Sequence, residues 1–229
     1  MVNLKAKKGE TPVLALPTDR RDREKLIKVV EQAAQVIRKG GVVIIPTETS
    51  YALAADATNE AAVKKVIELK AGKVEKRGIS IIVSDLRMAQ KYAKLNNEAE
   101  FLAQSFMPGP LTLIVDKQNL PDCLSESGVA FSISSNITAR LLAQESEVPL
   151  TGTGAHPAGE APIYKIDEIK KHYDHKVDLI IDAGNLVPVM PSTVIDMREN
   201  PPQIIREGPL SSKEILSQLD YFKKRREGH

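Results

Sequence analysis

Short apolar runs alternate along the chain with segments of helical spacing. Within residues 22–39, apolar side chains recur every three or four positions, which predicts an amphipathic helix that Gly40-Gly41 end. The β-branched run at 42–45 follows directly and leads into a proline, a pattern typical of a buried strand. We therefore expect the polar segment 46–51 to form a loop at the edge of a sheet.

The same alternation continues to the end of the chain. Helices are expected near 59–70, 85–106, 136–146 and 165–173 and from residue 211 or 212 onward, and strands at 79–83, 111–115, 129–133, 148–152, 178–182, 193–197 and 203–206. Strands that alternate with helices predict an α/β fold with a mostly parallel or mixed sheet. We expect an extended lead-in over 1–21, one domain over 22–222 and a basic C-terminal tail over 223–229.

Composition and charge limit the kinds of partner and the cellular compartment that fit this domain. With 229 residues and 42% hydrophobic side chains, the chain is long enough to bury one core. Its 32 basic and 30 acidic residues nearly cancel, so charge alone gives no strong attraction to a polyanion. The single cysteine, Cys123, cannot form an intramolecular disulfide, and no apolar run approaches the roughly 20 residues of a membrane span. These features predict a soluble, cytoplasmic protein with no membrane partner.

Four polar side chains stand close together where the first buried strand ends. Thr47, Glu48, Thr49 and Tyr51 all carry hydrogen-bonding groups. Open α/β sheets bind ligands at such strand exits, although a polar loop after a buried strand is often only a turn. A ligand site and a plain turn therefore both remain open on these residues alone.

A basic segment follows about twenty residues later. Its cations are Lys70, Lys73, Lys76 and Arg77, and glycines stand among them. Ammonium and guanidinium groups neutralise phosphate, and glycine lets backbone N–H groups approach it, so a polyphosphate site is one interpretation. A solvated loop is the other.

Several common sites are excluded by missing motifs. The chain has no Walker A sequence, and Gly152-Thr153-Gly154 lacks the third glycine of a dinucleotide fingerprint. The four histidines are too scattered for a metal site, and no Ser-His-Asp arrangement has support. We assign no metal ligand and no catalytic nucleophile or base.

Taken in order, several motifs resemble one family over about 175 residues. They are PTETSYALAADA at 46–57, IELK at 67–70, ISIIVSDL at 79–86, PGPLTLIV at 108–115, PLTGTGAHPAGEAP at 149–162, IIDAG at 180–184, PSTVID at 191–196 and IIREG at 204–208. This sequence resembles the YrdC-like family. The resemblance implies a single-domain, twisted mixed α/β sheet with flanking helices and a large concave cavity.

The resemblance also implies an activity. YrdC-like enzymes are nucleotidyltransferases that make threonylcarbamoyl-adenylate from ATP, bicarbonate and L-threonine, with Mg²⁺ accompanying the ATP, and the product serves tRNA modification. By this resemblance, threonine would contact Thr47, Thr49 and Ser192. The ATP phosphates would contact Lys70, Lys73, Arg206, His156 and Thr193.

Some positions depart from the family pattern. Ala52 and Ala54 replace glycines, so their methyl groups are expected to occupy space that a ligand would use. Ser132 stands where the family has an arginine for the threonine carboxylate, and Gly154-Ala155-His156 replaces Ser-Ala-Asn. These changes keep a second hypothesis open, a divergent paralogue of the YciO type that binds nucleotide, double-stranded RNA or tRNA without this activity.

Overall fold

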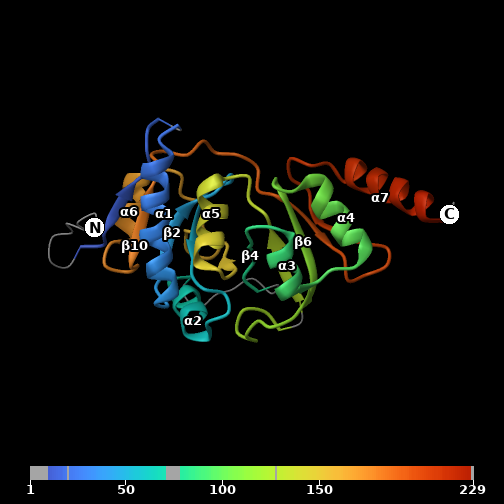
Figure 1. Cartoon of the computed structure of the whole chain (residues 1–229), viewed down its shortest axis with the longest axis horizontal. Coiled ribbons are helices and arrows are strands. Elements are labelled where there is room, and N and C mark those ends of the chain that lie inside the picture. The colour runs from blue at the N-terminus through green and yellow to red at the C-terminus, as the bar shows by residue number, and fades with distance from the viewer. Residues whose placement is uncertain (1–9, 20, 71–77, 127, 228–229) are drawn as a thin grey trace.

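Two mixed β-sheets lie side by side along the long axis of the computed structural model (Figure 1), which describes residues 10–19, 21–70, 78–126 and 128–227. The first sheet contains, in spatial order, β1 (Val13–Ala15), β10 (Leu179–Asp182), β2 (Val43–Pro46), β3 (Tyr51–Ala54) and β9 (Thr153–Gly154). The second contains β12 (Gln203–Arg206), β11 (Thr193–Asp196), β6 (Leu111–Lys117), β7 (Gly128–Ser132), β4 (Ile81–Ile82) and β8 (Leu150–Thr151), with β5 (Ala93–Lys94) paired to β6. The predicted mixed α/β fold is confirmed, with the strands divided between two sheets.

Helices flank both sheets. They are α1 (Arg23–Arg38), α2 (Glu60–Leu69), α3 (Leu86–Tyr92), α4 (Asn97–Phe106), α5 (Ile137–Ser146), α6 (Ile166–Tyr173) and α7 (Ser212–Glu227). The first five begin where an Asp or Asn side chain accepts a backbone N–H of the first turn, the expected way to satisfy those donors. In Figure 1, α1 and α6 lie beside the first sheet, whereas α4 and α7 lie at the far end beside the second.

One short segment, Leu150 to Gly154, connects the two sheets. Its first half, β8, pairs with β4 of the second sheet, and its second half, β9, pairs with β3 of the first. Between them, Gly152 donates its N–H to the Ser80 carbonyl and accepts the Ser80 hydroxyl. The fully buried Thr151 hydroxyl donates to the Leu53 carbonyl. The segment therefore fixes how the facing edges of the two sheets meet.

Four strands lie outside the predicted ones, and one of them, β5, separates α3 from α4 within the predicted helical range 85–106. β1 falls within the predicted lead-in and pairs in parallel with β10. β3 directly follows the predicted loop and pairs with β2 and β9, and β9 is only two residues long. At the C-terminal end, α7 continues into the predicted tail as far as Glu227. Within this helix, Lys223 forms an ion pair with Glu98 of α4.

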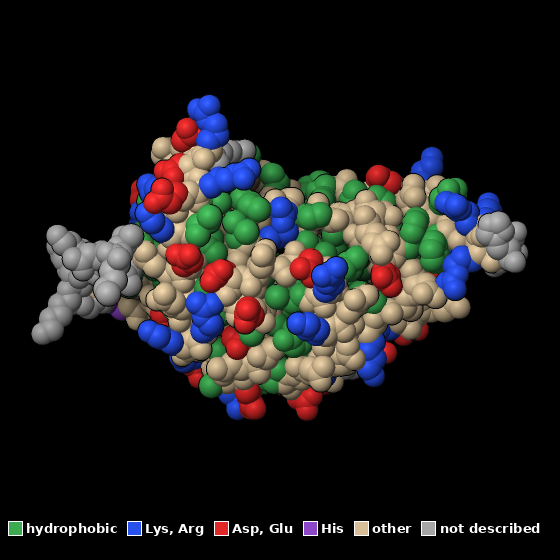
Figure 2. All heavy atoms as spheres, viewed as in Figure 1, with side chains coloured by type: hydrophobic (Ala, Val, Ile, Leu, Met, Phe, Trp, Pro, Cys, Tyr) green, Lys and Arg blue, Asp and Glu red, His purple; other side chains and the backbone are tan. Residues whose placement is uncertain are grey.

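The surface shows no patch of a single charge on the face drawn in Figure 2, where basic and acidic side chains are interspersed. This agrees with the net charge of +2. Among the described residues, no helix combines the length and apolar character needed to cross a bilayer. Because positive and negative charges nearly balance, recognition of an anionic ligand must come from local groups.

Candidate active site between the two sheets

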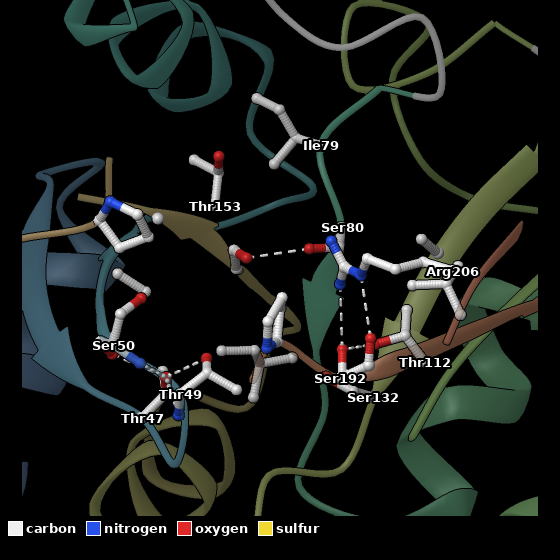
Figure 3. Close-up of a pocket in the computed structure, with 18 of the residues that line it drawn as sticks. Thr47, Thr49, Ser50, Ile79, Ser80, Thr112, Ser132, Thr153, Ser192 and Arg206 are labelled. Carbon is white, nitrogen blue, oxygen red and sulfur yellow. Dashed lines mark hydrogen bonds between the residues drawn. The ribbon is translucent and has the colours of Figure 1, made fainter. Parts of the chain in front are cut away.

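A cavity of about 630 Å³ lies between the sheets and is lined mainly by hydroxyl, small apolar and a few charged side chains. One wall comes from the β2–β3 turn and β9, and the other from β4, β6, β7, β11 and β12. Figure 3 shows Thr47, Thr49 and Ser50 on one side and Thr112, Ser132, Ser192 and Arg206 on the other. The volume of the cavity is within the range typical of small-molecule sites.

The turn between β2 and β3 is organised around the Thr47 hydroxyl. This oxygen donates to the Ser50 carbonyl at 2.7 Å and lies 3.1 Å from the Thr49 hydroxyl. It also accepts the backbone N–H groups of Thr49 and Ser50, each at 3.2 Å. The predicted threonine-binding pair, Thr47 and Thr49, is thus held rigidly at the cavity wall.

Arg206 and Ser192 lie together on the opposite wall. The Arg206 Nε donates to the Ser192 carbonyl at 3.0 Å, and its Nη2 lies 3.4 Å from the Ser192 hydroxyl (Figure 3). That hydroxyl is 2.8 Å from the Thr112 hydroxyl. Strand register places Thr112, Val194 and Arg206 in one row across β6, β11 and β12. Together with Ser192, this row presents a guanidinium and two hydroxyls to the cavity.

Lys70 follows the last residue of α2 and places a cation at the edge of the cavity. Its side chain lines the cavity, although the residue is only 7% exposed. The ammonium donates to the backbone carbonyls of Gly154 at 3.0 Å and His156 at 2.5 Å. Burial of a charge this deep requires such partners. Lys73, predicted beside it, lies outside the described residues.

His156 also lines the cavity, and its ring packs over Gly154. A Cβ at position 154 would lie 2.5 Å from His156 Nε2, so only glycine leaves room for the imidazole as it stands. His156 Nδ1 is 3.0 Å from the Pro157 carbonyl. Burial lowers the pKa of His156 and the Lys70 ammonium lowers it further, whereas the Pro157 and Glu160 carbonyls and the Glu160 carboxylate act in the opposite direction.

Thr193 does not lie with the other predicted site residues. It is fully buried and is absent from the cavity lining. Its hydroxyl donates to the Leu210 carbonyl at 2.7 Å and accepts the N–H groups of Gly208 and Leu210. Thr193 therefore ties the segment after β12 to the start of β11, and the structure gives it no contact with a ligand in this cavity.

Of three residues that depart from the family pattern, two line the cavity and one does not. Ala52 lines the cavity, as expected for a methyl group that takes up ligand space. Ala54 does not: it is fully buried and pairs with Val43 inside the first sheet. Ser132 lines the second-sheet wall at the end of β7 (Figure 3). Only Ala52 and Ser132 of these three can alter ligand contacts directly.

Glu48 was a candidate only as part of the polar loop, without an assigned ligand, and several hydroxyls of the cavity wall were not predicted at all. Glu48 is the one carboxylate among the described lining residues, and the Ser134 hydroxyl donates to it. Ser134 is almost fully buried and accepts the backbone N–H of Asn136. The sequence places Glu48 inside the polar loop, but nothing in the sequence signals its contact with a residue 86 positions away.

Tyr51, the fourth polar residue of the predicted loop, lies outside the cavity lining and anchors the end of the loop to the segment after β10. Its hydroxyl donates to the Gly184 carbonyl at 2.7 Å and accepts the Ala183 N–H at 3.0 Å. Burial raises its pKa from 10.0 to about 12, so the fold favours the neutral phenol. The associated stability is complete below pH 10 and is lost as the pH rises toward 12.

Tyr51→Phe is expected to lower the free energy of unfolding by about 1–3 kcal/mol near neutral pH, because the Ala183 N–H loses its acceptor. The variant should also lose part of the alkaline decline in stability that the phenol causes. Urea unfolding curves at neutral and alkaline pH would measure both effects. An alkaline decline as steep as that of the wild type would contradict this role.

Together, the two-sheet α/β fold and a polar cavity that carries the cations Lys70 and Arg206 define a protein with a small-molecule site suited to an anionic ligand. The family that matches is Sua5_yciO_yrdC, described as "Telomere recombination", over residues 35–208. The chain belongs to this family, and the resemblance inferred from the motifs is confirmed.

Similar proteins include named synthases. A putative threonylcarbamoyl-AMP synthase of Methanocaldococcus jannaschii is 35% identical over 195 residues, covering 85% of this chain and 92% of that protein. The threonylcarbamoyl-AMP synthase of Pyrococcus abyssi is 35% identical over 187 residues, which cover 80% of this chain. The match spans only 55% of the P. abyssi protein's length.

Solved structures agree on the fold. P. abyssi Sua5 complexed with L-threonine matches with a TM-score of 0.82 and 32% identity, covering 91% of this chain and 61% of that one. Escherichia coli YciO matches with a TM-score of 0.79 and 26% identity, covering 90% and 99% of the two chains. The fold is thus shared both by a named synthase and by YciO.

Proposed function

We propose that this protein is an ATP-dependent synthase that converts L-threonine and bicarbonate to threonylcarbamoyl-adenylate and releases pyrophosphate. The observation that carries the proposal is that Thr47, Lys70, Ser192 and Arg206, which are far apart in sequence, line one cavity. The names of the M. jannaschii and P. abyssi relatives support the same activity. The reaction class would be nucleotidyl transfer, in the cytoplasm, where a protein with a single cysteine fits.

The walls suggest how the substrates divide the cavity. We place threonine between the Thr47–Thr49 turn and the Ser192 hydroxyl, and the phosphates near Lys70 and Arg206. Adenylation moves charge onto the bridging phosphate oxygens, so positioned cations can stabilise the transition state without a covalent nucleophile. In this arrangement hydroxyls from both walls hold the amino acid, and the cations Lys70 and Arg206 hold the nucleotide.

Magnesium would enter with the nucleotide. Within the described ranges, no group of three or more His, Cys, Asp and Glu side chains is placed to hold a metal ion. A Mg²⁺ ion that accompanies ATP would be held mainly by triphosphate oxygens, as is usual for this ion. It would neutralise charge on the phosphates, while Lys70 and Arg206 position them.

Pyrophosphate release tests the proposal directly. The purified protein is incubated with ATP, Mg²⁺ and bicarbonate, with and without L-threonine, and with other small amino acids in parallel. We expect release that depends on threonine. Release without this dependence, or none while ATP still binds, would refute the synthase and favour a divergent paralogue.

The same protein can be tested for RNA binding as the alternative outcome. Binding to tRNA or double-stranded RNA through phosphate contacts would weaken steeply as salt is added, because each contact releases counterions. Such binding without pyrophosphate release would place the chain among nucleic-acid-binding paralogues. Its partners would then be RNA rather than threonine and bicarbonate.

A further inference from the structure

We propose that His156 accepts the proton of the substrate's amino group through Nε2 and so prepares that amine to attack bicarbonate. The inference rests on the proposed function and assigns a catalytic base to it. The hydrogen-bond partner of Nδ1 determines which ring nitrogen of the neutral histidine carries the proton. The Pro157 carbonyl, 3.0 Å from Nδ1, can only accept, so the neutral ring carries its proton on Nδ1. Nε2 then bears the lone pair.

The position of the ring fits this role. β9 pairs antiparallel with β3, with Gly154 opposite Ala52, and the Ala155 N–H donates to the Tyr51 carbonyl at 2.8 Å. His156 stands two residues after the end of β9, where its own N–H turns back to donate to the Gly154 carbonyl at 2.9 Å. The His156 side chain lines the same cavity as Thr47 and Thr49, to which we assign threonine.

Gly154 and Lys70 fix the ring from two sides. The imidazole fills the space where a side chain at residue 154 would stand, since a Cβ there would come within 2.5 Å of Nε2. Lys70 holds the backbone on both sides of Ala155 through the Gly154 and His156 carbonyls. The family pattern has Ser-Ala-Asn here, so the small glycine and the large histidine depart from that pattern together.

Charge explains why the ring is available as a base. Among the described residues, the charged groups facing His156 are the Lys70 ammonium and the Glu160 carboxylate, and burial together with Lys70 outweighs Glu160 in lowering the pKa. A neutral ring does not donate from Nε2 to phosphate, which is itself an acceptor, so the phosphate contact predicted for His156 would require a protonated ring. When the triphosphate neutralises Lys70, accepting a proton becomes easier. ATP binding should thus strengthen the base.

The step balances as a proton transfer followed by condensation. The N–H bond of R–NH₃⁺ breaks, a bond from Nε2 to hydrogen forms, and the products are R–NH₂ and imidazolium. The amine lone pair then forms a C–N bond with bicarbonate, giving the carbamate R–NH–COO⁻ and water. The imidazolium returns its proton to solvent.

Three variants of the full-length protein test the base. His156→Gln is expected to lower threonine-dependent pyrophosphate release about a hundredfold, the lower range for general base catalysis. It should also remove the fall in rate on the acidic side that protonation of His156 causes in the wild type. Gly154→Ala should act similarly although it keeps the histidine, because its methyl group displaces the ring. Imidazole added to His156→Ala should restore part of the rate.

The matched control is His172→Gln on α6, which lies outside the cavity lining and should keep the wild-type rate and pH profile. A folded His156→Gln variant with the wild-type profile would overturn the base while leaving the synthase intact. Reduced rates with an unchanged acidic limb and no imidazole rescue would likewise overturn it, since they indicate only a structural role. Wild-type protein without threonine-dependent release would overturn both proposals.

Discussion

Replacing Lys70 with methionine is expected to lower threonine-dependent pyrophosphate release about a hundredfold or more, because the substitution removes a fixed cation from the phosphate side of the cavity. Methionine nearly preserves the length of the side chain but cannot donate. The Gly154 and His156 carbonyls also lose their ammonium donor. We therefore expect a further loss of about 1–3 kcal/mol in the free energy of unfolding.

Lys65→Met provides the control on the same helix. The Lys65 ammonium also donates to a backbone carbonyl, that of Gly40 at 2.9 Å, but the residue is exposed and lies outside the cavity lining. Its loss should leave pyrophosphate release unchanged. Steady-state kinetics and urea unfolding on both variants separate the two effects. A folded Lys70→Met protein that retains wild-type kinetics would show that Lys70 only supports the backbone.

The predictable part of the fold is the part encoded by local patterns. The β-branched run before Pro46 predicts β2, whose four residues are all buried, and helical spacing predicts α1 nearly to its ends. β3 was not predicted because its sequence, YALA, shows no alternation and contains two alanines, which have low strand propensity. It becomes a strand because β2 and β9 supply partners on both sides.

The site was predictable to the extent that the motifs identified its positions. The motifs identify Thr47, Lys70, Ser192 and Arg206, and all four line the cavity. Contacts between distant segments, such as Ser134 with Glu48, have no local signal. The pairing of Gly154 with His156 likewise follows from the position of the ring, which neither residue type reveals alone.

Strand alternation could have separated Ser192 from Thr193. Successive side chains of a strand point to opposite faces, so two adjacent hydroxyls at a strand entrance cannot both face one cavity. The structure follows this rule: Ser192 and Val194 line the cavity, and Thr193 between them does not. The motif alone does not show which of its two hydroxyls faces the cavity.

Thr193→Val is accordingly expected to destabilise the protein by about 2–4 kcal/mol without changing substrate affinity, because valine preserves the shape but leaves one carbonyl and two N–H groups without their partner. The packing leaves little room for compensation. A Cβ on the neighbouring Gly208 would lie 2.2 Å from the Pro191 carbonyl, so the two chain segments are already in close contact.

Ser192→Ala is the counterpart one residue away. It removes the hydroxyl that contacts Thr112 and Arg206 at the cavity wall, so we expect weaker threonine binding with a much smaller loss of stability. Urea unfolding and titration calorimetry with L-threonine, applied to both variants, should give opposite patterns. Weaker threonine or ATP binding by Thr193→Val, with an unchanged unfolding curve, would contradict this prediction. It would mean that the second-sheet wall rearranges when substrate binds and that Thr193 contacts the substrate.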